Sequence, residues 1–225
     1  MPLRRTTAGL LLYALPLLAL IGGRATGAAA QVPPSADSLA ARIQERYDTV
    51  RDFTADFTQR LSGGLVLAGK TAVDRGKVAI RKPGFMRWVL ETGDRSEITA
   101  NGVQVVFYSP DDKLATIKPL PKDDTAPSAL LLLSGRGRIT RDFTAALPPD
   151  QPTGQWRLML TPKARQSDFK TIALIVDRTT LQLRGLEVTD SQDAVQTFTF
   201  SNLRENQGIK DDVFQIKIPK GAAIR

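Results

Sequence analysis

The sequence predicts a mainly β (α+β) protein built on one large antiparallel sheet. After a single helix-like stretch, apolar residues recur with a period of two or in short β-rich runs, and turn signals separate these runs. Ten or more short strands with close turns form a sheet that must curl or close on itself. A content of 42% hydrophobic and 24% charged residues is typical of a globular protein.

The first element is not part of the predicted fold, because residues 1–30 are typical of a cleaved secretory signal peptide. A basic start precedes the apolar stretch 8–21, and a run of small residues ends at 28–30. The apolar stretch is shorter than the roughly 20 residues that span a bilayer, so we expect cleavage near Gln31 and not a membrane anchor. Cleavage removes three arginines and lowers the formal charge from +8 to +5. The remainder, 31–225, is expected to be one domain.

The helix is predicted to open at Pro34-Ser35, because Leu39, Ile43 and Tyr47 then recur at helical spacing. The predicted strand runs that follow are 53–58, 65–73, 77–80, 85–91, 96–100, 104–108, 114–118, 156–161, 171–177, 182–189, 195–200 and 213–218. Asn101-Gly102 is the best candidate for a tight hairpin turn, since both residue types tolerate positive φ.

Between residues 120 and 144 the strand pattern stops. A short helix around the four leucines 130–133 is predicted there, ending at Gly135. These leucines are apolar all round their single turn, so they must be covered on both sides or face an apolar ligand. On the run 85–91, Met86, Trp88 and Leu90 share one face. A curled sheet with such a helix over its open side is a natural apolar container, although the same side chains would also fill an ordinary core.

Several motifs suggest catalysis but lack its context. The chain has no His and no Cys, which excludes a Ser-His-Asp triad, a Cys nucleophile, a disulfide and the usual zinc ligands. Residues 64–71 match GxxxxGK[ST], but strand-like residues fill the loop and no helix follows. Residues 167–170 match SxxK without the partner motifs, and the pairs at 111–112, 123–124 and 211–212 are typical turn aspartates. We therefore expect no enzyme, no metal, no nucleotide and no other cofactor. No basic run suggests nucleic acid.

The chain resembles the outer-membrane lipoprotein carrier protein (LolA) family. The matching segments, in order, are FTADFTQ at 53–59, KVAIRKPGFMRW at 77–88, NG at 101–102 leading to FYSP at 107–110, the leucines at 130–133, LTPKA at 160–164 and FQIKIPKG at 214–221. Each segment is weak alone, but six in the family's order, behind a signal peptide and without a Cys to be lipidated, are specific together.

The resemblance implies an incomplete antiparallel β-barrel of about 10–11 strands with short helices covering its open mouth. It also implies a monomeric periplasmic carrier that accepts triacylated lipoproteins from an ATP-driven inner-membrane transporter and delivers them to an outer-membrane receptor. The family places a basic residue before a Pro to tie the lid closed; here that residue is Lys82, since Arg81 points to the opposite face. Residues expected to line the cavity or its lid are Phe57, Met86, Trp88, Leu90, Phe107, Leu130, Leu133, Phe143, Met159 and Phe198.

Three alternatives remain open from the sequence. A periplasmic lipid or glycolipid carrier or sensor would share the fold. A carboxylate-based hydrolase would need separated acids on inward strand faces, whereas the acids here lie mostly in turns. A structural adaptor would have no apolar cavity.

Overall fold

The computed structural model describes residues 33–63, 73–120, 132–164 and 169–225. The elements in the part 34–225 are α1 (Ala36–Asp48), β1 (Asp52–Gly63), β2 (Val73–Arg81), β3 (Phe85–Leu90), β4 (Ser96–Asn101), β5 (Gln104–Ser109), β6 (Leu114–Pro119), α3 (Ile139–Asp142), β7 (Phe143–Ala146), β8 (Gln155–Pro162), β9 (Thr171–Asp177), β10 (Leu183–Thr189), β11 (Ala194–Glu205), the 3-10 helix η1 (Asp211–Phe214) and β12 (Ala223–Ile224). No helix in these ranges is long and apolar enough to cross a membrane.

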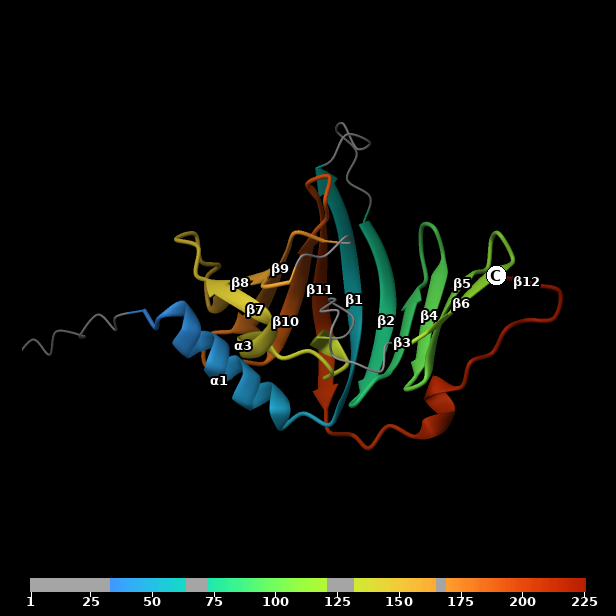
Figure 1. The fold of residues 1–225 in the computed structure, drawn as a ribbon, viewed down its shortest axis with the longest axis horizontal. Helices are drawn as coiled ribbons and strands as arrows, with labels where there is room; N and C mark the ends of the chain where they lie inside the picture. The colour runs from blue at the N-terminus through green and yellow to red at the C-terminus, as the bar shows by residue number, and fades with distance from the viewer. Residues whose placement is uncertain (1–32, 64–72, 121–131, 165–168) are drawn as a thin grey trace, which may run out of the picture. The chain divides into compact units, whose positions relative to one another are not determined.

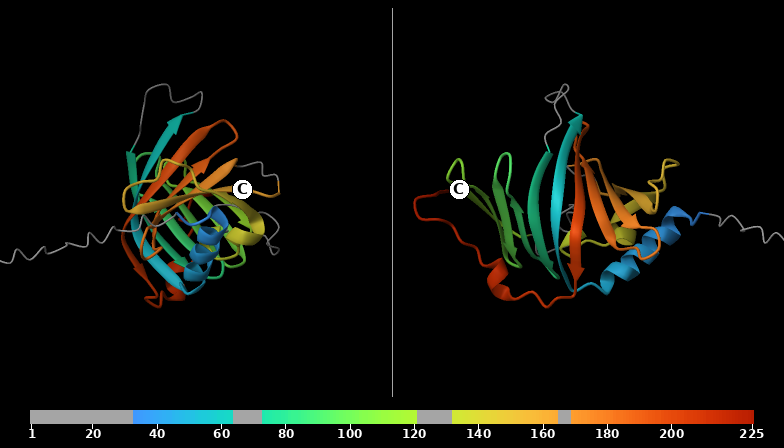
Figure 2. Two further views of the ribbon diagram at one scale, coloured as in Figure 1. Left: turned by 90° about the vertical axis from the view of Figure 1, so that its left-hand side faces the viewer. Right: turned by 180° about the vertical axis from the view of Figure 1, so that it is seen from behind.

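Within the described ranges, twelve strands form one sheet in the order β12-β6-β5-β4-β3-β2-β1-β11-β10-β9-β8-β7. The sheet curls strongly but does not close (Figures 1 and 2). Neighbours are antiparallel except β12, which runs parallel to β6. The predicted fold class, an incomplete antiparallel barrel with helices over its mouth, is therefore confirmed. The GxxxxGK[ST] match at 64–71, which was rejected as a nucleotide site, and most of the predicted strand 65–73 lie outside the described residues.

Three details at the ends of the sheet differ from the sequence prediction. The run 213–218 is not a strand: η1 occupies its start, and Phe214 is buried to 1% exposure beside Phe85. Its apolar alternation arises because the segment packs across the sheet and not within it. Strands β7 and β12 were not predicted, since four and two residues are too short to show a period.

Helix α1 begins where the sequence predicts. The Ser35 hydroxyl accepts the Ser38 amide at 3.2 Å and caps the helix. Leu39, Ala40 and Ile43 are buried at the apolar spacing that predicted the helix. The helix packs against β7, β8 and α3 at one side of the curled sheet (Figure 1).

The hairpin at Asn101-Gly102 is also confirmed, as it joins β4 to β5. Gly102 takes a φ of +86°, which only glycine adopts at little cost. The Asn101 side-chain oxygen accepts the amides of Val103 and Gln104, both at 3.1 Å. The turn thus uses one glycine and one local side-chain hydrogen-bonding residue.

The C-terminal strap, residues 206–222, crosses from β11 to β12. At its start the buried Asp52 accepts the amides of Gln207 and Gly208 at 2.7 and 3.1 Å. Further along, the Arg81 guanidinium lies over the rings of Phe85 and Phe214, 4.3 and 5.2 Å from their centroids. It also forms an ion pair with Asp211 in η1. Arg81 therefore fixes the strap to the outside of the sheet, opposite to Lys82.

Gly76 in β2 is a sensitive point of this sheet. A Cβ there would lie 2.1 Å from the Val89 carbonyl oxygen and 2.4 Å from the Phe57 ring. We expect Gly76→Ala to lower the free energy of unfolding by about 3 kcal/mol or more, since a buried ring and a strand backbone cannot both yield. Urea unfolding measures this loss. Gly154→Ala is the control: its Cβ would meet nothing within 4 Å, so only its φ of +71° costs energy, about 1 kcal/mol. Equal losses would contradict the prediction.

Candidate functional site

One face of the curled sheet is apolar along most of its width. Directly paired residues share a face, so Val78, Trp88, Ile98 and Phe107 form one row across β2 to β5. Aromatic rings gather at the middle of this face. The Trp88 ring lies 4.7 Å from Phe57 and 5.0 Å from Phe198. The inner face is thus a continuous apolar surface.

The structure places most of the predicted lining residues on this inner face. They are Phe57, Met86, Trp88, Leu90, Phe107, Phe143 and Phe198. Met86 is fully buried, whereas Phe107, toward the β6 side, is 37% exposed. Leu133 is buried in the segment that covers the face. Leu130 lies outside the described residues.

Met159 is the exception, and its predicted position is corrected. On β8 the buried residues are Trp156, Leu158 and Leu160, so Met159 points to the other face. It shares that face with Arg157, whose guanidinium donates to Glu187 at 2.7 and 2.9 Å. The sequence prediction followed side-chain size, while strand alternation decides the direction.

Helix α1 and the lid segment, defined as residues 132–142, pack on the apolar interior: α1 contacts β7 and β8, and Leu132 and Leu133 belong to the same buried cluster as Leu39 and Ile43. Leu132 and Leu133 are helical and buried, as the prediction of a leucine helix requires. The Tyr47 hydroxyl donates to the Leu133 carbonyl oxygen at 2.5 Å. The Ile139 amide donates to the Gln44 side-chain oxygen at 2.7 Å. Burial raises the pKa of Tyr47 well above its ordinary value, so this hydroxyl remains a donor at any physiological pH.

Lys82 lies where α1, the lid segment and the β2–β3 turn meet. Its Nζ donates to the Tyr47 carbonyl oxygen and lies 3.8 Å from the centre of the Tyr47 ring. Its stem passes Gly135, where a Cβ would lie 2.1 Å from the Lys82 Cδ. Gly135 is therefore required both for its φ of +75° and for this close approach. Burial lowers the pKa of Lys82 to about 8.

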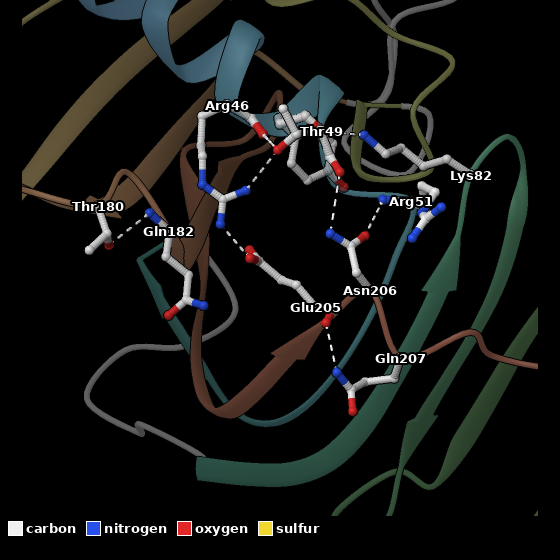
Figure 3. Close-up of polar contacts among 10 residues, drawn as sticks. Arg46, Thr49, Arg51, Lys82, Thr180, Gln182, Glu205, Asn206 and Gln207 are labelled. Carbon is white, nitrogen blue, oxygen red and sulfur yellow. Dashed lines mark hydrogen bonds and ion pairs between the residues drawn. The ribbon is translucent and has the colours of Figure 1, made fainter.

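Polar contacts surround this junction (Figure 3). Arg46 of α1 forms an ion pair with Glu205 at the end of β11. The Asn206 side chain donates to the Thr49 carbonyl oxygen at 3.3 Å and accepts the Arg51 amide at 2.7 Å. The end of α1 is thus fixed to the end of β11 by side chains from both.

The lid segment is also bonded to the far turns of the sheet. The Gly84 amide donates to the Ser134 carbonyl oxygen at 3.0 Å. The Arg136 guanidinium donates to the Gly102 carbonyl oxygen at 2.7 Å. Tyr47 was expected only as an apolar residue of the helix, and no role was expected for Gln44 or Arg136. The only sequence feature that could have indicated these polar contacts was the run of polar and glycine residues after the leucines 130–133.

The apolar pocket that the described residues form under the cover is small. An apolar pocket between α1, the lid segment and β9–β10 has a volume of about 30 Å³ and is lined by residues such as Ile43, Tyr47 and Leu133. Since one water molecule needs about 10–15 Å³ of such space, the pocket has room for about two. In the described ranges no group of His, Cys, Asp and Glu could hold a metal ion. The described residues therefore form an apolar interior beneath a cover that hydrogen bonds hold in place.

These features define a class of mainly β proteins in which a curled open sheet encloses an apolar interior beneath helices. Within that class, the model of the family described as outer membrane lipoprotein carrier protein LolA matches residues 48–217. The chain belongs to this family, which is one of carriers and not of enzymes.

Individual relatives are similar in sequence to this chain over most of its length. The outer-membrane lipoprotein carrier protein of Hahella chejuensis is 29% identical over 214 residues, 93% of this chain and 98% of the relative. That of Nitrosomonas europaea is 30% identical over 173 residues, 76% and 81% of the two chains. Among solved structures, an uncharacterized conserved protein from Thermus thermophilus aligns with a TM-score of 0.51 at 11% identity, over 83% of this chain and 98% of that one. This last likeness concerns the fold alone.

The lowered pKa of Lys82 predicts a pH dependence of stability. The unfolded amine titrates near 10.5, so between about pH 8 and pH 10.5 the folded protein binds fewer protons than the unfolded chain. The free energy of unfolding should therefore rise with pH through this window. In Lys82→Met this rise should be smaller by about 1 kcal/mol between pH 7.5 and 9.5, a value discounted for the partial exposure of the amine.

Urea unfolding at the two pH values measures this difference. The control is Lys170→Met, which removes an exposed ammonium paired with Asp193 and should keep the pH slope of the unaltered chain. If Lys82→Met keeps that slope too, burial of the amine at this junction is not what shapes the pH dependence.

Proposed function

We propose that this protein is a periplasmic carrier that shields the acyl chains of lipoproteins in its lidded apolar interior. It takes triacylated lipoproteins from an ATP-driven inner-membrane transporter and passes them to an outer-membrane receptor. Membership of the lipoprotein carrier family supports cargo of this class. The observation that carries the proposal is the continuous apolar inner face beneath a cover held by polar bonds.

The energetics explain why such cargo needs a carrier. At roughly 0.8 kcal/mol per buried CH₂, an anchor with on the order of forty methylenes costs about 30 kcal/mol to expose to water. Unassisted passage is therefore negligible. A carrier offers an apolar surface instead and must still release the chains, so its interior should bind less tightly than the receptor does.

Loading requires the cover to move. The apolar pocket of about 30 Å³ is far below the 300–1,000 Å³ of ordinary ligand sites. Opening would separate α1 from the lid segment by breaking the bonds from Tyr47 to Leu133 and from Gln44 to Ile139. In this proposal Lys82 acts as the latch. Its point charge and its contact with Tyr47 give a weaker closure than a planar, five-donor arginine would.

The location and route form part of the same proposal. The signal-peptide pattern of residues 1–30 supports export into the periplasm. The proposed carrier acts there as a monomer. The carrier needs no nucleotide of its own, since the transporter and the affinity difference between carrier and receptor set the direction. A periplasmic lipid or glycolipid carrier is the second candidate, because the same apolar face would accept other acyl chains.

Native mass spectrometry of the purified exported protein tests the proposal. Mixed with a detergent-solubilised triacylated lipoprotein, it should form a one-to-one complex. Leu133→Glu places a charge in the lid at a site only 3% exposed and should weaken capture at least tenfold. Met159→Glu is the matched control, because Met159 lies on the opposite face of the sheet and its change should leave capture intact.

The possible outcomes separate the candidate functions. Circular dichroism and thermal melting confirm that each variant is folded before its binding is compared. Capture of phospholipid or glycolipid without lipoprotein would favour the second candidate. If nothing apolar binds, or if both variants lose binding equally, the inner face is only a structural core and the proposal fails.

A further inference from the structure

A second hollow lies on the outer face of the sheet, opposite to the apolar interior. It has a volume of about 700 Å³, within the roughly 300–1,000 Å³ of ordinary ligand sites. Thr54 of β1 and Ala79 of β2 are directly paired and line its floor. Arg204 of β11 follows on one side of this pair and Arg87 of β3 on the other. Two small side chains between two arginines therefore create the hollow.

A β-bulge in β11 turns Arg204 toward this hollow. Phe198 and Phe200 are buried on the inner face, so strict alternation would turn residue 204 inward as well. Residues 202 and 203 instead lie opposite a single residue of β1, and Asn202 takes a φ of +52°. Leu203 therefore packs on the core, and Arg204 lines the outer hollow. Bulges that re-aim a side chain at some cost in backbone strain are common next to functional sites.

Two charged side chains of this hollow have no ion-pair partner among the described residues. Arg204 forms neither a hydrogen bond nor an ion pair there. Asp56 accepts a hydrogen bond at 2.8 Å from the neutral amide of Asn202. Lys77 lies opposite Asp56 in the register, but its Nζ is 3.0 Å from Glu91, and the pKa of Lys77 is raised first by Glu91 and least by Asp56. The hollow thus presents one cation and one anion to an incoming molecule.

Opposite charges in one hollow favour a polypeptide as its occupant. Asp56 would repel a phosphate group or the surface of an anionic membrane. Arg87 is already paired with Glu97 at 2.9 Å, so it adds no second free cation for such a ligand. A peptide segment can instead offer a carboxylate to Arg204 and an ammonium to Asp56. Its small or apolar side chains can lie against Val213 at the edge of the hollow.

Strand geometry sets the charge spacing and the length of that segment. Arg204 pairs with Thr54, and Asp56 lies two residues further along β1. One strand spacing of about 4.8 Å and a rise of about 3.3 Å per residue place the two charged positions about 8 Å apart. Alternate residues of an extended chain share a face and are about 7 Å apart. On β3, Arg87 to Glu91 line the hollow over about 13 Å, the span of about five extended residues.

We propose that this outer hollow binds an extended segment of a partner protein, about five residues long, with an acidic and a basic side chain two residues apart. The acid pairs with Arg204 and the base with Asp56. The site goes beyond the carrier function, because it lies on the face of the sheet opposite to the apolar interior. A partner can therefore hold the protein there while the cover over the interior moves.

An NMR titration of the isotope-labelled exported protein with the blocked peptide acetyl-Thr-Glu-Val-Lys-Thr-amide tests the proposal. The peptide should shift the amide signals of Thr54, Ala79 and Asn202 and leave those of the lid segment unchanged. Arg204→Gln should weaken binding about threefold to fivefold, the loss of one exposed ion pair. It should not weaken binding of the peptide that has Gln in place of Glu, because that pair is then already absent.

A second variant fills the hollow, and two controls alter the same face outside it. Ala79→Leu should block the floor and abolish binding. Arg60→Gln removes an exposed arginine from the outer face of β1, and Thr58→Leu adds bulk to that face. Both controls should bind like the unaltered protein. Because Ala79 and Thr58 are partly exposed, thermal melting should show that all four variants are folded.

The outcomes decide the proposal without reference to acyl binding. Binding with these losses supports the site. The proposal is overturned if the peptide shifts no signals, if it shifts mainly those of the lid segment, or if Arg60→Gln weakens binding as much as Arg204→Gln. It is also overturned if light scattering shows self-association that Arg204→Gln abolishes, because the occupant is then a second copy of the chain. Lipoprotein capture reports the carrier function separately and should be equal in all four variants.

Discussion

The structure depends on covering one apolar face of a curled antiparallel sheet. Such a sheet can leave its outer face in water, but its inner rows of Phe, Trp, Met and Leu side chains must be enclosed. Helix α1 and the lid segment provide that enclosure. They are joined to each other and to the sheet through Tyr47, Gln44 and Lys82. A neutral bond of this kind is worth about 1 kcal/mol net and one from a charged amine about 1.5–3 kcal/mol, so these polar contacts add a few kcal/mol to the burial of the apolar side chains of the cover.

Much of this fold could be predicted from the sequence, since local rules decide it. Helical spacing and the Ser35 cap located α1, and alternation located the longer strands. The prediction failed where a segment was too short to show a period, as in β7 and β12. It also failed at 213–218, where Phe214 alternates with its neighbours because it packs on Arg81 and Phe85 across the sheet.

In the candidate site, too, features set by local sequence rules could be predicted and long-range contacts could not. Strand alternation correctly predicted which residues of the longer strands point inward, such as Trp88. Met159 was assigned to the wrong face because that prediction followed side-chain size and not strand alternation. The position of Lys82 came from a family resemblance. The polar contacts of Gln44 and Arg136 depend on segments far apart in the sequence meeting in space, so no local pattern could have shown them.

The two edge strands of the sheet have a further consequence. Both are very short, β12 with two residues and β7 with four, and α1 and α3 pack against β7. Short or covered outer strands give other molecules little backbone to pair with. If the proposed carrier function requires apolar surface to be uncovered, these short outer strands protect the open form from pairing with its neighbours edge to edge, the first step toward amyloid-like aggregation.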